Sequence, residues 1–282
     1  MFRARPLAAI VALATVLVTA AAVPARADTL RPVAAGPVGA GAAADRGDWR
    51  FAVGGGVLVR PEYEGAKDYE ADFAPVVSVS YREFVQLRGT ALSADLLGIL
   101  GARPVAGLQA GPVVRYRFGR DQDDSAALRG LGDVDGSVEV GGFVRWASGP
   151  WSIGATVVQD VAGGHEGMLA ELDAGWRTPI AARWTLGISS QLTWADGNYS
   201  QTFFGITTGQ AARSGRSPYA ADGGLKDVGL TVSLDYAVTR NWGLSGRVGY
   251  KRLLGDAADS PLVDGDGSPD QFLGGLFVSY RF

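Results

Sequence analysis

The sequence contains no cysteine, one histidine and two methionines in 282 residues. Without cysteine the chain cannot form disulfides, thiolate-bound zinc sites or iron–sulfur clusters. An excess of basic residues is also missing, because the formal net charge is −3. A basic surface for nucleic acid is therefore not indicated. We expect no cofactor, no metal and no nucleic-acid partner.

Long apolar runs are missing except at the N-terminus. There, Arg3 and Arg5 precede an apolar run from Leu7 to Val23, which is followed by Ala25 and Ala27 in A-x-A spacing. This arrangement is typical of a secretory signal peptide, here residues 1–27, cleaved after Ala27. A short membrane anchor is the alternative.

Residues 28–48, the segment after the expected cleavage site, are rich in Ala, Gly and Pro and show no apolar period. We interpret them as a flexible leader, so that the folded domain is 49–282. No later run approaches the roughly 18 consecutive apolar residues that a membrane-spanning helix needs. If the exported protein resides in a membrane, it does not span it with helices.

What the sequence does contain is apolar and polar residues in strict alternation. In "DVGLTVSLDYAV" every second residue from Val228 to Val238 is apolar, and the same period continues to the C-terminus in "FLGGLFVSYRF". A period of two predicts β-strands. The candidate strands are 49–60, 70–81, 83–97, 104–119, 134–147, 150–161, 168–178, 182–194, 198–208, 223–238, 240–254 and 271–282.

Two architectures fit this alternation, a soluble sandwich and a transmembrane barrel. The polar face combines Gly, Ser and Thr with charges of both signs, and Trp residues recur at strand ends, as at Trp49, Trp184 and Trp242. Aromatic residues at these positions suit two membrane interfaces. We therefore predict an all-β protein, a transmembrane antiparallel β-barrel of the bacterial outer membrane, with about 12 strands and ten as an alternative.

One part of this strand assignment conflicts with the usual barrel design. It makes the segment after Arg120 a periplasmic connection and the tight "SGP" at 148–150 an external one, whereas periplasmic turns are usually short. An alternative splits 83–97 into two short strands and places "NYSQTFFGIT" in the lumen as part of one long external loop. Both versions have twelve strands and periplasmic termini.

The last strand ends in a large aromatic residue. Phe282, Tyr280, Val278 and Leu276 share one face. Such an ending resembles the signal by which outer-membrane barrels are recognised for assembly. We expect the barrel-assembly machinery to recognise these four residues. We also expect the finished barrel to contact outer-membrane lipid and lipopolysaccharide.

The polar face places many charges toward the predicted lumen, because an Arg or Lys facing lipid near the midplane costs about 2–4 kcal/mol. These charges either pair into a closed network or line a narrow aqueous path that favours small anions or zwitterions. The residues are Arg115, Arg117, Glu139, Arg145, Glu171, Asp173, Arg177, Asp227, Asp235, Arg247, Lys251 and Arg281.

Several motifs, in order along the chain, carry a resemblance to a known family. They are "PEYEGAKDY" at 61–69, "RYRFGRDQDD" at 115–124, "GGHEG" at 163–167, "WADGNYSQTFFGI" at 194–206, "GGLKD" at 223–227, "GDAADSP" at 255–261 and the closing "YRF". Together they resemble the MipA/OmpV family of outer-membrane proteins. The resemblance implies a scaffold that brings a lytic transglycosylase and a peptidoglycan synthase together, and it brings no catalytic residues.

Two other features have plain interpretations beside functional ones. His165, the single histidine, is surrounded by glycines that describe a turn, although an outer-membrane hydrolase would also need a histidine. The loop from Gly255 to Asp270 is acidic but lacks the glutamate that completes a calcium loop. We rank an envelope scaffold first, a small-solute channel second and an enzyme third.

Overall fold

The structure, a computed structural model, describes residues 48–282. The predicted signal peptide and all of the predicted leader except Asp48 lie outside these residues. The elements are β1 (Trp49–Pro61), β2 (Tyr69–Tyr81), β3 (Val85–Arg88), β4 (Ala91–Ala94), α2 (Leu96–Ile99), β5 (Leu108–Arg117), η1 (Ala126–Leu128), β6 (Ser137–Ser148), β7 (Trp151–Asp160), β8 (Met168–Ala181), β9 (Trp184–Ala195), α3 (Gly197–Phe204), α4 (Thr208–Ser214), β10 (Gly224–Ala237), β11 (Trp242–Leu253), α5 (Gly255–Asp259), η2 (Pro261–Gly265) and β12 (Asp270–Arg281).

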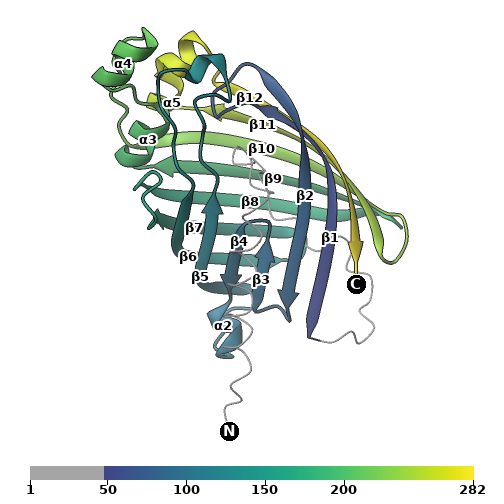
Figure 1. The fold of residues 1–282 in the computed structure, drawn as a ribbon. Coiled ribbons are helices and arrows are strands. Elements are labelled where there is room, and N and C mark those ends of the chain that lie inside the picture. The colour runs from purple at the N-terminus through teal and green to yellow at the C-terminus, as the bar shows by residue number, and fades with distance from the viewer. Residues whose placement is uncertain (1–47) are drawn as a thin grey trace.

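The twelve strands form one closed antiparallel barrel, which confirms the predicted fold class (Figure 1). Each strand pairs with its neighbour in the chain, and β1 pairs with β12 from Ala52↔Arg281 to Val59↔Gly274. Closure leaves no free sheet edge along this seam, so the backbone groups of the first and last strands are satisfied within the barrel.

The outer face of the barrel is apolar. Val57, Phe73, Val248 and Leu276 point outward and are exposed. Exposed aromatic residues mark both ends of this face: Trp49, Trp146, Trp151, Trp184 and Trp242 at one end, and Tyr69, Tyr250 and Phe272 at the other. Two such belts are what the two interfaces of a membrane attract. Among residues 48–282, no helix is long and apolar enough to cross a membrane.

The two ends of the barrel differ in their connections. The end that holds the start of β1 and the end of β12 has the tight connections 149–150, 182–183 and 238–241, whereas α3, α4 and α5 gather at the opposite end (Figure 1). Because outer-membrane barrels have short periplasmic turns and long external loops, we call the first end periplasmic and the second external. The chain therefore follows the alternative path predicted from the sequence, in which 83–97 is split into two short strands and "NYSQTFFGIT" belongs to a long external connection.

Two of the strands first assigned from the alternation are wrong. Residues 83–97 form the hairpin β3–β4 and the short helix α2, because Gly89, with φ of 55°, turns the chain in the middle. Residues 198–208 form most of α3 and the start of α4 rather than a strand.

Local chemistry explains the helix α3. Asp196 caps it by accepting a hydrogen bond from the backbone N–H of Tyr199. Tyr199, Ser200, Phe203 and Phe204 are buried together, at the spacing of one helix face. Because the apolar segment within 198–208 is short, its period did not distinguish a helix from a strand.

Candidate functional site

The structure places all twelve residues proposed to line the lumen on the inner face of the barrel. They fall into two groups. Six lie on the external halves of their strands, and these are Arg115, Arg117, Glu139, Glu171, Asp227 and Lys251. The other six lie between the middle of the barrel and its periplasmic end. They are Arg145, Asp173, Arg177, Asp235, Arg247 and Arg281.

The first group is centred on the fully buried carboxylate of Glu139. It accepts hydrogen bonds from Arg115 Nε and from Arg117 Nε, the latter at 2.6 Å. Arg115 also reaches Glu171, 2.8 Å from its Nη1. The buried carboxylates of Glu139 and Glu171 each have a guanidinium partner. This pairing offsets the free-energy cost of removing the charges from water.

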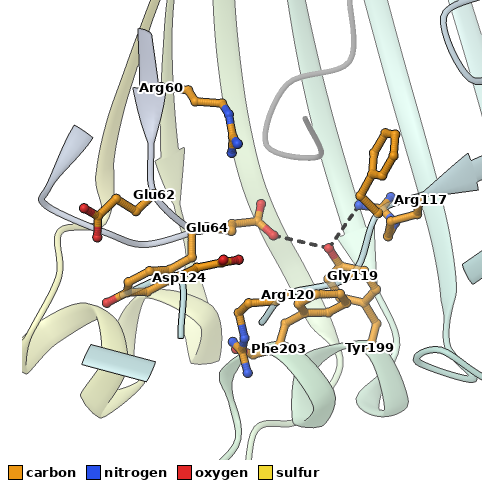
Figure 2. A pocket seen from close by; sticks show the side chains of 11 residues that line it. Arg60, Glu62, Glu64, Arg117, Gly119, Arg120, Asp124, Tyr199 and Phe203 are labelled. Atoms are coloured by element: carbon orange, nitrogen blue, oxygen red, sulfur yellow. Dashed lines mark hydrogen bonds between the residues drawn. The ribbon is translucent and has the colours of Figure 1, made fainter. Parts of the chain in front are cut away.

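A second carboxylate, Glu64, enters the lumen from the loop between β1 and β2. Its Oε1 lies 2.6 Å from Lys226 Nζ and 2.5 Å from Lys251 Nζ. Its Oε2 accepts a hydrogen bond from the Tyr199 hydroxyl, which Arg117 also contacts (Figure 2). Burial opposes ionisation of Glu64, but the two ammonium groups outweigh burial and hold its pKa well below its ordinary value.

Lys226 was not among the residues predicted to face the lumen. Strict alternation assigns it to the lipid face, together with Val228. The register between β9 and β10 shifts between Leu225 and Asp227, however, and this bulge turns both Lys226 and Asp227 inward, where each is buried. A β-bulge re-aims one extra side chain in this way. The glycine pair at 223–224, just before the bulge, is the only sequence signal of it.

These contacts make one balanced group, which we call the outer charge network. It contains four cations, Arg115, Arg117, Lys226 and Lys251, and four carboxylates, Glu64, Glu139, Glu171 and Asp227. His165 joins it with Nε2 at 3.1 Å from Glu139, and its Nδ1 accepts the Gly167 N–H. Both ring nitrogens therefore contact groups of the protein itself.

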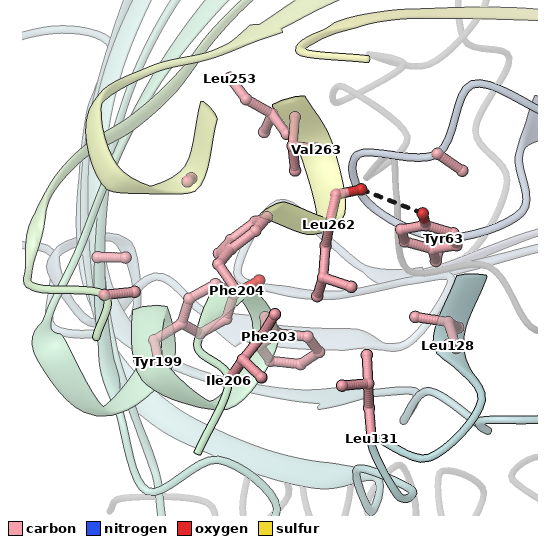
Figure 3. Packing of buried hydrophobic residues seen from close by; sticks show 14 of the residues in the cluster. Tyr63, Leu128, Leu131, Tyr199, Phe203, Phe204, Ile206, Leu253, Leu262 and Val263 are labelled. Atoms are coloured by element: carbon pink, nitrogen blue, oxygen red, sulfur yellow. Dashed lines mark hydrogen bonds between the residues drawn. The ribbon is translucent and has the colours of Figure 1, made fainter. Parts of the chain in front are cut away.

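Above the network, the external connections pack into a hydrophobic cap (Figure 3). Tyr63, Leu128, Phe204, Ile206 and Leu262 come from four different connections and are at most 4% exposed. The Tyr63 hydroxyl donates to the Leu262 carbonyl at 3.3 Å. Burial of each large side chain contributes about 1.5–3 kcal/mol, so the cap is a stable part of the fold.

A small pocket remains between the connections 62–68 and 118–136. Arg120 and Tyr63 line it, with Glu64 and Tyr199 (Figure 2). Its volume of about 50 Å³ suits a few water molecules rather than a ligand. Burial lowers the pKa of Arg120 to about 10, and this guanidinium donates to the Phe203 carbonyl at 2.7 Å.

The second group, toward the periplasm, contains an ion pair and a cation–π contact. Arg177 forms an ion pair with Asp235 at 2.6 Å, and Asp235 also accepts a hydrogen bond from Ser245. The guanidinium of Arg247 lies 5.6 Å from the centre of the Phe277 ring. Asp235 is buried, whereas Arg145, Asp173, Arg177, Arg247 and Arg281 are half-buried.

The four residues of the predicted assembly signal lie on the outer face of β12 and at its end. Leu276, Val278 and Phe282 are exposed, and Tyr280 packs edge-on against Trp242 and Phe282. The Phe282 N–H donates to the Phe51 carbonyl at 3.1 Å, so the last residue is still paired with β1.

With this geometry established, comparison with known proteins identifies the family. The family model described as MltA-interacting protein MipA matches residues 53–282. The chain belongs to the MipA family. Its relatives and its barrel make it an outer-membrane protein in contact with lipid.

Three relatives illustrate the range of similarity within the MipA family. Outer membrane protein OmpV of Vibrio cholerae is 26% identical over 170 residues, which cover 57% of this chain and 61% of OmpV. YiaT of Escherichia coli K12 is 28% identical over 167 residues, or 58% of this chain and 65% of YiaT. The chain thus spans less than two thirds of either relative. Omp26La of Vibrio anguillarum is 25% identical over 232 residues, which cover 77% of this chain and 81% of Omp26La.

Solved structures with a similar barrel include the NanC porin and an outer membrane channel of Pseudomonas putida F1. The NanC porin has 12% identity and a TM-score of 0.42, covering 82% of this chain and 98% of the porin. The Pseudomonas channel has 13% identity and a TM-score of 0.44, covering 85% and 97%.

Apart from the closing "YRF", which lies at the periplasmic end, the motifs that resemble the MipA family converge on the outer charge network and the cap. "PEYEGAKDY" supplies Glu64, "RYRFG" supplies Arg115 and Arg117, and "GGHEG" supplies His165. "GGLKD" supplies Lys226 and Asp227. Tyr199 and Phe204 come from "WADGNYSQTFFGI", and Ser260, from "GDAADSP", donates to the Phe204 carbonyl at 2.6 Å. Motifs that are far apart in the sequence thus build one structure at the external end.

Proposed function

We propose that this MipA-family barrel is a non-enzymatic interaction protein of the cell envelope. It binds a lytic transglycosylase and, with a peptidoglycan synthase, links the peptidoglycan machinery to the outer membrane. The observation that carries this proposal is the closed external end, where the hydrophobic cap lies over a balanced network of ion pairs. The description of the matched family, which names an interaction with MltA, supports the choice of partner.

The partner would bind at the periplasmic end, and the connection 95–107 suits this role. It is the longest connection at that end among residues 48–282. Leu96, Leu100 and Val105 on it are 45%, 71% and 53% exposed. Exposed apolar side chains grouped on one segment are a common feature of protein contact surfaces.

This segment is held in place before any partner binds. The buried carboxylate of Asp95 accepts hydrogen bonds from the backbone N–H groups of Gly98 and Ala110, both at 3.2 Å. Its other oxygen lies 2.7 Å from Arg103 Nη2. A preordered contact surface loses less conformational entropy on binding.

Binding of the purified, refolded barrel to a lytic transglycosylase from the same bacterium tests the proposal. Surface-immobilised enzyme should bind the wild-type barrel. The double variant Leu96→Ser/Leu100→Ser should bind with an affinity at least about tenfold lower. Val161→Ser is the matched control, because Val161 is 64% exposed but lies in an external connection. No binding by the wild-type barrel, or equal loss in the control, would contradict the proposed interaction.

A narrow channel for small solutes is the alternative function. The half-buried arginines of the periplasmic half of the lumen, such as Arg145 and Arg177, favour it. Single-channel recording in planar bilayers separates the two functions: a closed barrel shows no steady current. Steady ohmic steps whose ion preference reverses in Arg145→Glu would establish a pore and make the interaction role secondary.

A further inference from the structure

The periplasmic half of the lumen carries an unusual excess of arginine. Six arginines occupy inward positions of its strands, and the acidic residues at inward strand positions of this half, among residues 48–282, are Asp173 and Asp235. We call these six the arginine vestibule; they are Arg50, Arg88, Arg145, Arg177, Arg247 and Arg281. The outer charge network, by contrast, balances its cations with an equal number of carboxylates.

Strand positions place these arginines together near one opening. Arg50 is the second residue of β1 and Arg281 the last of β12, both at the periplasmic end. Arg145 lies in the last third of β6, which ends at that side. Arg177 lies in the last third of β8, which ends at the same side, and Arg88 is opposite Ser78 of the adjacent strand β2.

Pairing within the protein accounts for only part of this charge. Asp235 pairs with Arg177 and also acts on Arg247 and Arg281. Among the described residues, Arg88 and Arg145 have no carboxylate within ion-pair distance. Arg145 has only a long contact of 3.5 Å to the Ser152 hydroxyl.

An arrangement of like charges in a confined space destabilises the barrel unless another group neutralises it. Fold stability therefore gives no reason to place Arg88 and Arg145, which have no ion pair in the described structure, beside the other arginines. Ionisable residues that face the interior of a membrane protein commonly mark a path or site for a charged ligand.

Solvent reaches this half of the lumen but is excluded from the other half. The side chain of Arg177 is 26% exposed, whereas that of Glu139 in the outer charge network is fully buried. The small inward residues Gly54, Ser78 and Gly175 of this half are themselves half-buried rather than buried. With its external end closed, the vestibule opens only toward the periplasm.

We propose that the arginine vestibule is a binding site for a small anion with two or more carboxylate or phosphate groups, entering from the periplasm. The fork of a guanidinium matches both oxyanions in bidentate geometry. Arg88 and Arg145 carry most of the binding because they have no competing carboxylate. This site is independent of the proposed transglycosylase interaction, since it lies in the lumen and not on the segment 95–107.

Calorimetric titration of the refolded barrel in neutral detergent tests the site. Citrate and tripolyphosphate are the probes, acetate is the monovalent comparison, and the preference between the two polyanions shows whether carboxylate or phosphate is the natural group. We expect saturable binding of at least one polyanion, much weaker binding of acetate, and an affinity that falls as salt increases.

Matched variants locate the site. Arg88→Gln and Arg145→Gln should each weaken binding by about tenfold to hundredfold, the range for hydrogen bonds to charged groups. Arg240→Gln removes the same charge from an exposed periplasmic turn and should leave the affinity unchanged. Asp235→Asn should tighten binding, because it frees Arg177, and it keeps the test decisive if an arginine variant fails to refold. The absence of saturable binding, or equal weakening in Arg240→Gln, would overturn the proposal.

Discussion

Glu64 and Lys251 lie 187 residues apart in the sequence, yet Glu64 Oε1 is 2.5 Å from Lys251 Nζ. This contact ties the first external connection to the strand before the last one. It closes the lumen from above, because Lys226 joins the same carboxylate and Tyr199 donates to it. A loop residue thus completes a network that the barrel wall leaves open.

Removing the Glu64 charge should destabilise the barrel. Glu64→Gln leaves Lys226 and Lys251 buried with less negative charge, and breaking a buried ion pair from one side costs about 3–5 kcal/mol. Urea unfolding in micelles measures the loss. The control is Glu62→Gln, in the same connection. Glu62 has no ion pair in the described structure, so this variant should change the free energy of unfolding by less than about 0.5 kcal/mol. Equal effects of both variants would contradict the role of Glu64.

The contribution of Glu64 should depend on pH in a defined direction. Its pKa in the folded barrel is below the ordinary value of 4.5. A carboxylate with a lowered pKa stabilises the fold above the unfolded pKa and loses that contribution as pH falls through the folded one. The difference in unfolding free energy between wild type and Glu64→Gln should therefore be constant from pH 6 to 8 and shrink below about pH 4.5. A difference that grew on acidification would contradict the assignment.

The bulge at Lys226 leads to a prediction opposite to that from alternation. If Lys226 faced lipid, replacing it with leucine would be harmless or stabilising. Because it is buried against Glu64 and Asp227, Lys226→Leu should destabilise the barrel by about 3–5 kcal/mol. Lys67→Leu, at an exposed position of an external connection, is the control for loss of a lysine. Unchanged unfolding of Lys226→Leu would place Lys226 outside the network.

The seam between β1 and β12 should tolerate no side chain at Gly56. A Cβ there would lie 2.0 Å from the Leu276 carbonyl oxygen, which is backbone and cannot move aside. We expect Gly56→Ala to destabilise the closed barrel by about 1–3 kcal/mol, a typical cost of overpacking. Gly274→Ala lies on the same seam with no atom near its Cβ and should fold normally. Heat-modifiable migration on gels reports closure, and identical migration of both variants would contradict the steric argument.

Phe282 should matter for assembly in the cell more than for the folded barrel. We expect Phe282→Ser to lower the amount of protein in the outer membrane severalfold, while the purified variant still refolds in micelles, because Phe282 lies beyond the last strand residue. Phe272→Ser removes an exposed phenylalanine from the start of the same strand and is the control. Equal outer-membrane levels for both variants would reject the assembly signal.

Much of the wall of this barrel was predictable, and the exceptions have physical causes. Alternation located ten of the strands, since each strand faces lipid on one side and the lumen on the other. It failed at 198–208, where Tyr199, Phe203 and Phe204 form a helix face, and the capping Asp196 was the available signal. It also failed at Gly89, where a short hairpin replaces one long strand, and at Lys226, where a bulge breaks the period.

The sequence by itself determined the barrel, its apolar outer face and the inward direction of most charges, because these follow from a period of two along each strand. Only the tertiary structure decided which charges meet. Whether Arg115 pairs with Glu139 depends on strand register, and whether Glu64 reaches Lys251 depends on how a loop folds into the lumen. Register and loop path are set by contacts between segments far apart in the chain. The balanced charge at the external end and the excess of arginine at the periplasmic end follow from them.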